Sequence, residues 1–103
     1  MSSDEIMKLD PLIHAPIRLS VLSVLMTVQS ADFAYLKKST QATDGNLSTH
    51  LSKLEAAGYI SMTKRFEGKK PKTHCAITPQ GRARFIQYIE SLQAIVDKQK
   101  GLS

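Results

Sequence analysis

A short stretch in the second half of the chain carries most of its net charge. Between positions 64 and 72 there are five basic residues and one acidic residue, Glu67, which gives +4 of the total +5 within nine residues. Clustered lysine and arginine side chains neutralise phosphates and release counterions, so they bind nucleic acid with little base specificity. A solvated strand edge whose lysines oppose aggregation is the alternative interpretation. We expect phosphate contacts from Lys64, Arg65, Lys69, Lys70 and Lys72.

Upstream of this stretch, polar residues interleave with regularly spaced leucines. Leu47, Leu51 and Leu54 recur at steps of four and three, which predicts a helix with these side chains on its buried face. A helix that reads DNA needs short polar or basic side chains on its outer face, because the major groove is only about 12 Å wide. The same residues also suit helix capping or a solvated surface. We expect base contacts from Asn46 and Thr49, and base or phosphate contacts from Ser48, His50 and Lys53.

Other chemistries find little support in the residue types. His14, His50 and His74 are too dispersed for a metal-ligand spacing, and a single cysteine, Cys75, cannot form a disulfide within the chain or a thiolate cluster. A lone cysteine in a strand is usually a small buried apolar residue, and a redox sensor is the alternative. There is no glycine-rich phosphate loop, paired-carboxylate arrangement or Ser/His/Asp set with a recognisable context. We therefore expect no catalytic site, metal or cofactor.

Three helices are predicted in the first part of the chain, and the third carries the polar residues that interleave with the leucines. An apolar stripe over residues 13–28 predicts a buried helix that begins near Ala15 or Pro16, after a short arm. Two further helices follow. The first of these ends near Thr40, and the other is closed by a left-handed Gly58. Their expected N-caps are Asp32 and Thr43.

After Gly58 the helical period disappears. Two β-prone runs, 59–66 and 72–77, flank the turn-forming residues 67–71, so a β-hairpin is predicted to carry the basic stretch. Gly68 and Pro71 are expected to shape the turn. Phe66 is expected to pack in the core or within the hairpin rather than to stack on a ligand.

A final helix is predicted over about residues 79–98, capped by Thr78 and started by Pro79. Its apolar residues recur at four, three and four, which suits pairing with a second copy, while packing on its own domain is the alternative. A terminal helix of about 20 residues is long for so small a domain. We expect a homodimer whose interface includes Phe85, Ile89, Leu92 and Val96, joined by the arm with Ile6, Met7 and Leu9.

The composition fits one modest globular domain over residues 1–103, with 42% hydrophobic residues. The positive charge points to nucleic acid or an anionic membrane surface as partner. No stretch has the length and apolarity of a membrane span, and residues 1–10 lack a signal-peptide pattern, so a cytoplasmic protein is expected. The order helix, helix, helix, hairpin, helix predicts a mainly α fold with a β-hairpin, a winged helix-turn-helix with an added C-terminal dimerisation helix.

Four segments strengthen this prediction by resemblance. Residues 43–60, 64–73 and 77–82 resemble winged-helix regulators of the MarR/ArsR type, in particular their small one-domain members, and residues 9–19 are similar to the first helix of that family. The similarity covers roughly residues 9–97.

The resemblance implies a homodimer that binds a roughly palindromic operator in double-stranded DNA. The third helix would enter the major groove and the hairpin wing would lie over the flanking minor groove, through the same ten residues named above. The paired cysteines of the metal-sensing members are absent, so metal sensing is not expected. The chain is also shorter than the drug-responsive members, which predicts no obvious effector pocket and leaves the effector unknown. A winged-helix module that binds another protein is the alternative function.

Overall fold

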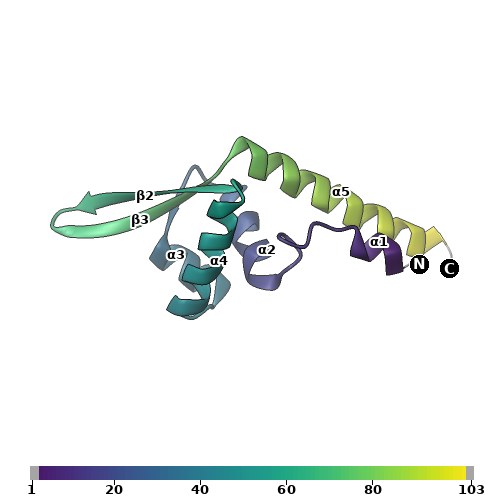
Figure 1. The fold of residues 1–103 in the computed structure, drawn as a ribbon, viewed down its shortest axis with the longest axis horizontal. Coiled ribbons are helices and arrows are strands. Elements are labelled where there is room, and N and C mark those ends of the chain that lie inside the picture. Colours follow the sequence, from purple (N-terminus) through teal and green to yellow (C-terminus); the bar gives the residue numbers. More distant parts are fainter. Residues whose placement is uncertain (1–2, 102–103) are drawn as a thin grey trace.

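The structure, a computed structural model, describes residues 3–101. Its elements follow the order α1 (Ser3–Met7), α2 (Pro16–Leu25), β1 (Ala31–Asp32), α3 (Phe33–Thr40), α4 (Asp44–Ala56), β2 (Ile60–Glu67), β3 (Lys70–Ile77) and α5 (Pro79–Gly101). The molecule measures 58 × 26 × 21 Å, and the β2–β3 hairpin and α5 extend from the helical body in opposite directions (Figure 1). The predicted mainly helical architecture with a hairpin and a long C-terminal helix is confirmed. Within residues 3–101, no helix has the length and apolarity needed to cross a membrane.

Three side-chain caps set the starts of α3, α4 and α5. Asp32, Thr43 and Thr78 each accept the backbone N–H of the residue three positions later, at 2.8, 3.2 and 2.9 Å. Each cap satisfies an N–H that has no partner within its own helix. All three predicted caps are confirmed.

The end of α4 is also determined by residues close to it in sequence. Gly58 has a φ of +82°, its N–H bonds to the Glu55 carbonyl at 2.9 Å, and the Tyr59 N–H bonds to the Leu54 carbonyl at 2.9 Å. This pair of bonds is the Schellman arrangement, in which glycine takes the left-handed position without the steric cost that a Cβ brings. The predicted left-handed Gly58 is confirmed, and it turns the chain directly into β2.

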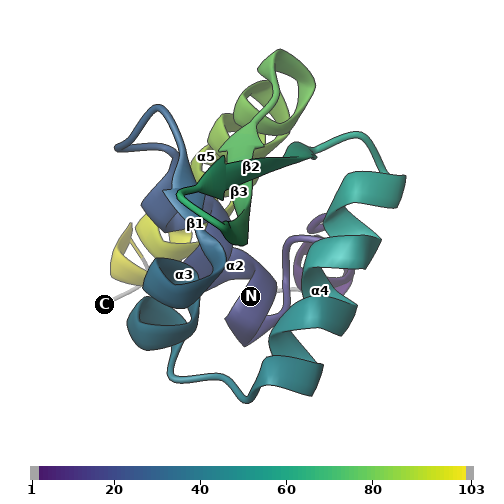
Figure 2. The ribbon, with the colours of Figure 1, turned by 90° about the vertical axis from the view of Figure 1, so that its left-hand side faces the viewer.

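α3 and α4 form a helix-turn-helix through the short connection 41–43. Gln41 has a φ of 57°, and its N–H bonds to the Lys37 carbonyl at 2.9 Å, so α3 ends in a left-handed residue. Lys37 also forms an ion pair with Asp44 at 2.8 Å, which joins the two helices beside the turn. In Figure 2 the two helices lie on either side of the base of the hairpin, with the turn at the lower edge.

The sheet has the order β1-β3-β2, with both pairs antiparallel. β1 contains two residues, and Ala31 lies opposite Cys75 in β3. The sequence did not predict this strand. The hairpin turn is also tighter than predicted, because the strands run to Glu67 and resume at Lys70. Gly68, with a φ of +64°, occupies the first central position of this two-residue turn, where a left-handed residue is favoured.

The core lies where α2, α3 and α4 meet the base of the sheet. Its side chains with no exposed surface include three leucines from α2 to α4 and the thiol of β3, namely Leu22, Leu36, Leu47 and Cys75. Burial raises the pKa of the Cys75 thiol to about 11, so the thiol stays protonated as an apolar core group. α2 ends at Leu25, three residues earlier than predicted, because the N–H and the hydroxyl of Thr27 both bond to the Val24 carbonyl.

The two ends of the described chain pack together, away from the hairpin. The sequence predicted an arm before α2, and its first part is the helix α1, which lies beside the far end of α5 (Figure 1). An ion pair between Glu5 and Lys98 joins the two helices. On α5, Phe85, Tyr88 and Ile95 form the buried face.

Candidate nucleic-acid interface

The outer face of α4 is polar, as its leucine spacing predicted. Leu47, Leu51 and Leu54 are buried, and the predicted contact residues on this helix are exposed except His50, which is half-buried. Steps of 100° per residue place Thr49 opposite the leucines, with Ser52 beside it. Ser52 was not among the predicted contacts, although the same helical period would have identified it.

The hairpin forms a wing that projects beyond the body. All residues from 63 to 71 are exposed. In the strand register Arg65 lies opposite Lys72 and Glu67 lies opposite Lys70, so these four side chains share one face, while Lys64 lies opposite Thr73 on the other. The wing therefore presents cationic side chains on both faces.

One of the five predicted wing cations is paired. Lys72 forms an ion pair with Glu67 at 2.9 Å, and hydrogen bonding to that carboxylate raises the pKa of Lys72. In the described part of the chain, no carboxylate lies within 4.0 Å of the other four, Lys64, Arg65, Lys69 and Lys70. These four charges remain available to an external anion, and Lys72 is available only in competition with Glu67.

The prediction that Phe66 packs in the hairpin or core is wrong. Its side chain is 74% exposed, because it lies near the tip of the wing, beyond the reach of the helical body. Its register partner is Pro71, so the wing tip carries two apolar residues among its lysines.

The wing and α4 lie at the same end of the molecule. In Figure 1 the hairpin, α3 and α4 occupy one end of the long axis, and α1 and the end of α5 occupy the other. The wing leaves the body next to the C-terminal end of α4, since only 57–59 separate the two elements. The helix that carries the exposed polar residues and the hairpin that carries the unpaired cations are therefore neighbouring elements.

His50 is held by a residue that the sequence did not single out. Arg18 of α2 donates from Nη1 to His50 Nδ1 at 2.9 Å and from Nε to the Leu12 carbonyl at 2.6 Å. The pKa of His50 is lowered, first by burial and then by the positive charges of Arg18 and Lys53. This shift favours the neutral imidazole on the flank of α4. No sequence period links positions 18 and 50.

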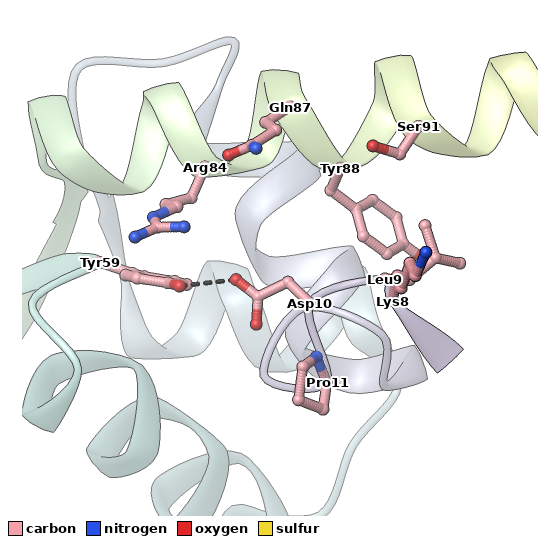
Figure 3. Close-up of a pocket in the computed structure, with 9 residues that line it drawn as sticks. All are labelled: Lys8, Leu9, Asp10, Pro11, Tyr59, Arg84, Gln87, Tyr88 and Ser91. Atoms are coloured by element: carbon pink, nitrogen blue, oxygen red, sulfur yellow. Dashed lines mark hydrogen bonds between the residues drawn. The ribbon is translucent and has the colours of Figure 1, made fainter. Parts of the chain in front are cut away.

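A cleft of about 340 Å³ lies at the junction of residues 8–11, Tyr59 and α5 (Figure 3). The Tyr59 hydroxyl donates to Asp10 Oδ2 at 2.6 Å across it, and Arg84 points toward this pair from α5. The short chain therefore has a concave polar site where the resemblance predicted no obvious pocket. Burial, with the hydrogen bond to Asp10, raises the pKa of Tyr59 to about 12.

This shift predicts a loss of stability at alkaline pH. The folded state keeps the Tyr59 proton up to a pKa of about 12, whereas an unfolded tyrosine ionises near its ordinary value of about 10. The stabilisation is therefore complete below pH 10 and is lost as the pH rises toward 12. Urea unfolding across this range should show a smaller alkaline loss for Tyr59→Phe than for wild type. Tyr35→Phe, at an exposed ring, is the control, and an equal loss in wild type and Tyr59→Phe would contradict the assignment.

The described residues contain no group of three or more His, Cys, Asp or Glu side chains arranged to hold a metal ion. What they do form is a helix-turn-helix followed by a two-stranded wing, which defines the winged helix class.

Comparison with known proteins identifies the family. Residues 17–96 match the model of the winged helix DNA-binding domain, and the chain belongs to this family. The uncharacterized protein MJ0432 of Methanocaldococcus jannaschii is 37% identical over 76 residues, which cover 74% of this chain and 83% of that protein.

Solved structures agree with this identification. A transcriptional regulator homologue from Pyrococcus horikoshii OT3 superposes with a TM-score of 0.85 at 30% identity, over 94% of this chain and 95% of that one. A MarR-family regulator from Silicibacter pomeroyi has a TM-score of 0.67 at 18% identity, over 94% of this chain and 64% of that one, and shares the fold. The chain is thus a DNA-binding protein with the fold of MarR-type transcriptional regulators.

Proposed function

We propose that this protein is a cytoplasmic, homodimeric transcriptional regulator that binds double-stranded DNA sequence-specifically. α4 enters the major groove, and the wing lies on the flanking backbone or minor groove. The observation that carries the proposal is that α4, with its exposed polar residues, and the wing, with four unpaired cations, are neighbouring elements toward the same end of the long axis. The proposed contacts are Asn46, Ser48, Thr49, His50, Lys53, Lys64, Arg65, Lys69, Lys70 and Lys72.

Selection from random duplexes, followed by fluorescence titration of the selected sequence at several salt concentrations, tests the proposal. We expect an enriched site with two-fold symmetry and an affinity that falls steeply with salt, because phosphate contacts release counterions. No enrichment, or an affinity that is unchanged by salt, would contradict it.

Substitutions on α4 should alter sequence preference rather than general affinity. Asn46 and Thr49 are exposed on the groove-facing side, and Asn46→Ala or Thr49→Val removes the hydrogen-bonding atoms. Loss of one base contact should cost about 1–3 kcal/mol against the selected base, or roughly 5- to 150-fold, with little change for unrelated duplexes. Competition binding with single-base variants measures this. Gln99→Ala, on the exposed far end of α5, should leave the preference unchanged, and equal losses on all duplexes would argue against base contact.

The proposed dimer uses the exposed apolar side of α5. Of the predicted interface residues, Ile89 and Val96 are 42% and 39% exposed, whereas Phe85 is buried in its own core and Leu92 packs partly against it. Ile86, on the same side, is 44% exposed, and Met7 of the adjacent α1 is 81% exposed. A second copy that covers this face would remove these side chains from water.

Placing charges on this face should separate the two copies. Ile89→Glu together with Val96→Glu should weaken dimerisation by tenfold or more, since the buried carboxylates would lack partners. Light scattering at several concentrations measures the assembly, and binding to a duplex with a single half-site should persist. Gln99→Glu is the charge control. A wild-type monomer at all concentrations would exclude the dimer.

A further inference from the structure

Arg18 connects three separate parts of the fold. It projects from α2, and its guanidinium donates from Nε to the Leu12 carbonyl at 2.6 Å, from Nη2 to the Pro11 carbonyl at 3.4 Å and from Nη1 to His50 Nδ1 at 2.9 Å. The first two contacts are to the loop before α2, and the third reaches the middle of α4, 32 positions away in sequence.

The contact with His50 determines where the imidazole carries its proton. A guanidinium has five N–H donors and no acceptor, so His50 Nδ1 must be the acceptor in this bond. A ring nitrogen that accepts has no proton, and a neutral imidazole then carries its proton on Nε2. The lowered pKa of His50 agrees with the neutral form.

The loop that holds Arg18 is itself fixed. Asp10 Oδ1 accepts the Leu12 N–H at 3.0 Å, while its other oxygen accepts the Tyr59 hydroxyl. The carbonyls of Pro11 and Leu12 are thereby kept in place, and they hold the planar guanidinium in one orientation. A lysine has a single nitrogen and cannot bond to the loop and to His50 with this geometry.

His50 keeps one hydrogen-bonding atom free. Within the described residues its hydrogen bond is the one at Nδ1, and Nε2 has no protein partner. The side chain is half-buried on the flank of α4, one turn from Asn46 and next to Lys53 on the following turn. The bond from Arg18 thus fixes the proton of His50 on Nε2, and this N–H is a hydrogen-bond donor beside the residues proposed to contact DNA.

We infer that Arg18 is a positioning residue for DNA recognition, which presents His50 to the duplex as an Nε2–H donor. The acceptor on DNA is a phosphate oxygen or a purine N7, both of which take a hydrogen bond from an N–H group. The inference rests on the proposed DNA binding of α4. It adds that this contact depends on a residue that lies outside the recognition helix.

The first measurement needs no DNA. Long-range ¹H–¹⁵N correlation spectra of the full chain should show His50 in the Nε2–H form in wild type and as a mixture of both tautomers in Arg18→Lys. A mixture in wild type would overturn the inference, even where DNA binding is intact. A chain with the Nε2–H form that binds no duplex would instead contradict the proposed function.

A double-mutant cycle then distinguishes positioning from a purely structural role. The side-chain N–H of glutamine lies near the place of Nε2–H, so His50→Gln keeps a donor that does not depend on Arg18. Arg18→Lys should weaken binding to the selected site about threefold to tenfold in the wild-type background, as for one hydrogen bond of modest net strength. It should have little effect in the His50→Gln background, and additive losses would overturn the inference. Unfolding midpoints of all variants show whether the fold is retained.

Chemically modified duplexes distinguish the two candidate acceptors on DNA. 7-Deazapurines remove N7, and methylphosphonates replace a charged phosphate oxygen. We compare wild type with His50→Phe on each duplex. Loss of the difference on deazapurine DNA assigns the contact to N7, and its loss on methylphosphonate DNA assigns it to the backbone. A difference that persists on both duplexes would overturn the proposed contact.

Discussion

Replacing Gly81 with alanine is expected to lower the free energy of unfolding by about 3 kcal/mol or more, the upper range for overpacking a closed site. A Cβ at this position would lie 2.0 Å from the Tyr59 carbonyl oxygen and 2.8 Å from its carbon. These are backbone atoms, so no side-chain rotation relieves the overlap.

Hydrogen bonds also fix the backbone around Gly81. Thr78 donates its N–H to the same Tyr59 oxygen at 3.0 Å and its hydroxyl to the Gly58 carbonyl at 2.6 Å. The first turn of α5 therefore rests directly on the segment that links α4 to the wing, and relief of the overlap must break these bonds. We expect weaker DNA binding in any Gly81→Ala protein that still folds.

Thermal and urea unfolding measure the effect. For a domain of about 100 residues, a loss of 3 kcal/mol corresponds to a fall in Tm of roughly 12–24 °C. Gly45→Ala is the matched control, because a Cβ there meets nothing within 4 Å and alanine favours a helix. The control should be neutral or slightly stabilising. A Gly81→Ala protein as stable as wild type would show that α5 does not pack on Tyr59 as described.

Local chemistry explains which parts of the fold the sequence could predict. The caps at Asp32, Thr43 and Thr78 and the left-handed Gly58 each depend on residues within a few positions, so composition and spacing suffice. The buried leucines of α4 follow from the helical period alone. These features fix the order of the elements, and the order identifies the fold.

The features that were missed depend on contacts between distant segments. β1 has two residues and exists because Ala31 pairs with Cys75, a contact that no local pattern records. The residue type alone predicts that Phe66 packs in the hairpin or core, yet its position near the end of a protruding hairpin leaves its side chain 74% exposed.

The same distinction applies to the candidate site. The exposed residues of α4 and the wing lysines could be identified one by one, since exposure follows from the helical period and charge. The pairing of Lys72 with Glu67 depends on the strand register, and the hydrogen bond from Arg18 to His50 depends on the packing of α2 against α4. On α5, the predicted stripe is one apolar face that the domain covers unevenly, because Phe85 is buried whereas Ile89, one turn later, is 42% exposed.

Removing two lysines from the wing tip is expected to have the largest effect on DNA binding. Lys69 lies in the turn and Lys70 begins β3, and neither has a carboxylate within 4.0 Å among the described residues. Each phosphate contact contributes about 0.9 to the slope of log K against log salt concentration. Lys69→Ala with Lys70→Ala should therefore reduce the slope by about 2 if one wing contacts the duplex, and by about 4 if both wings of a dimer do.

At about 0.1 M salt, this loss of counterion release corresponds to a fall in affinity of tenfold or more, equal for selected and unrelated duplexes. Lys72→Ala should reduce the slope by less than either tip lysine, because Glu67 already neutralises part of that charge. Lys8→Ala removes a positive charge just after α1, at the opposite end of the molecule, and should leave the slope nearly unchanged. Fluorescence titrations between about 50 and 200 mM salt, over which the Debye length falls about twofold, measure these slopes. Equal slopes for the tip and distal variants would contradict a phosphate-binding wing.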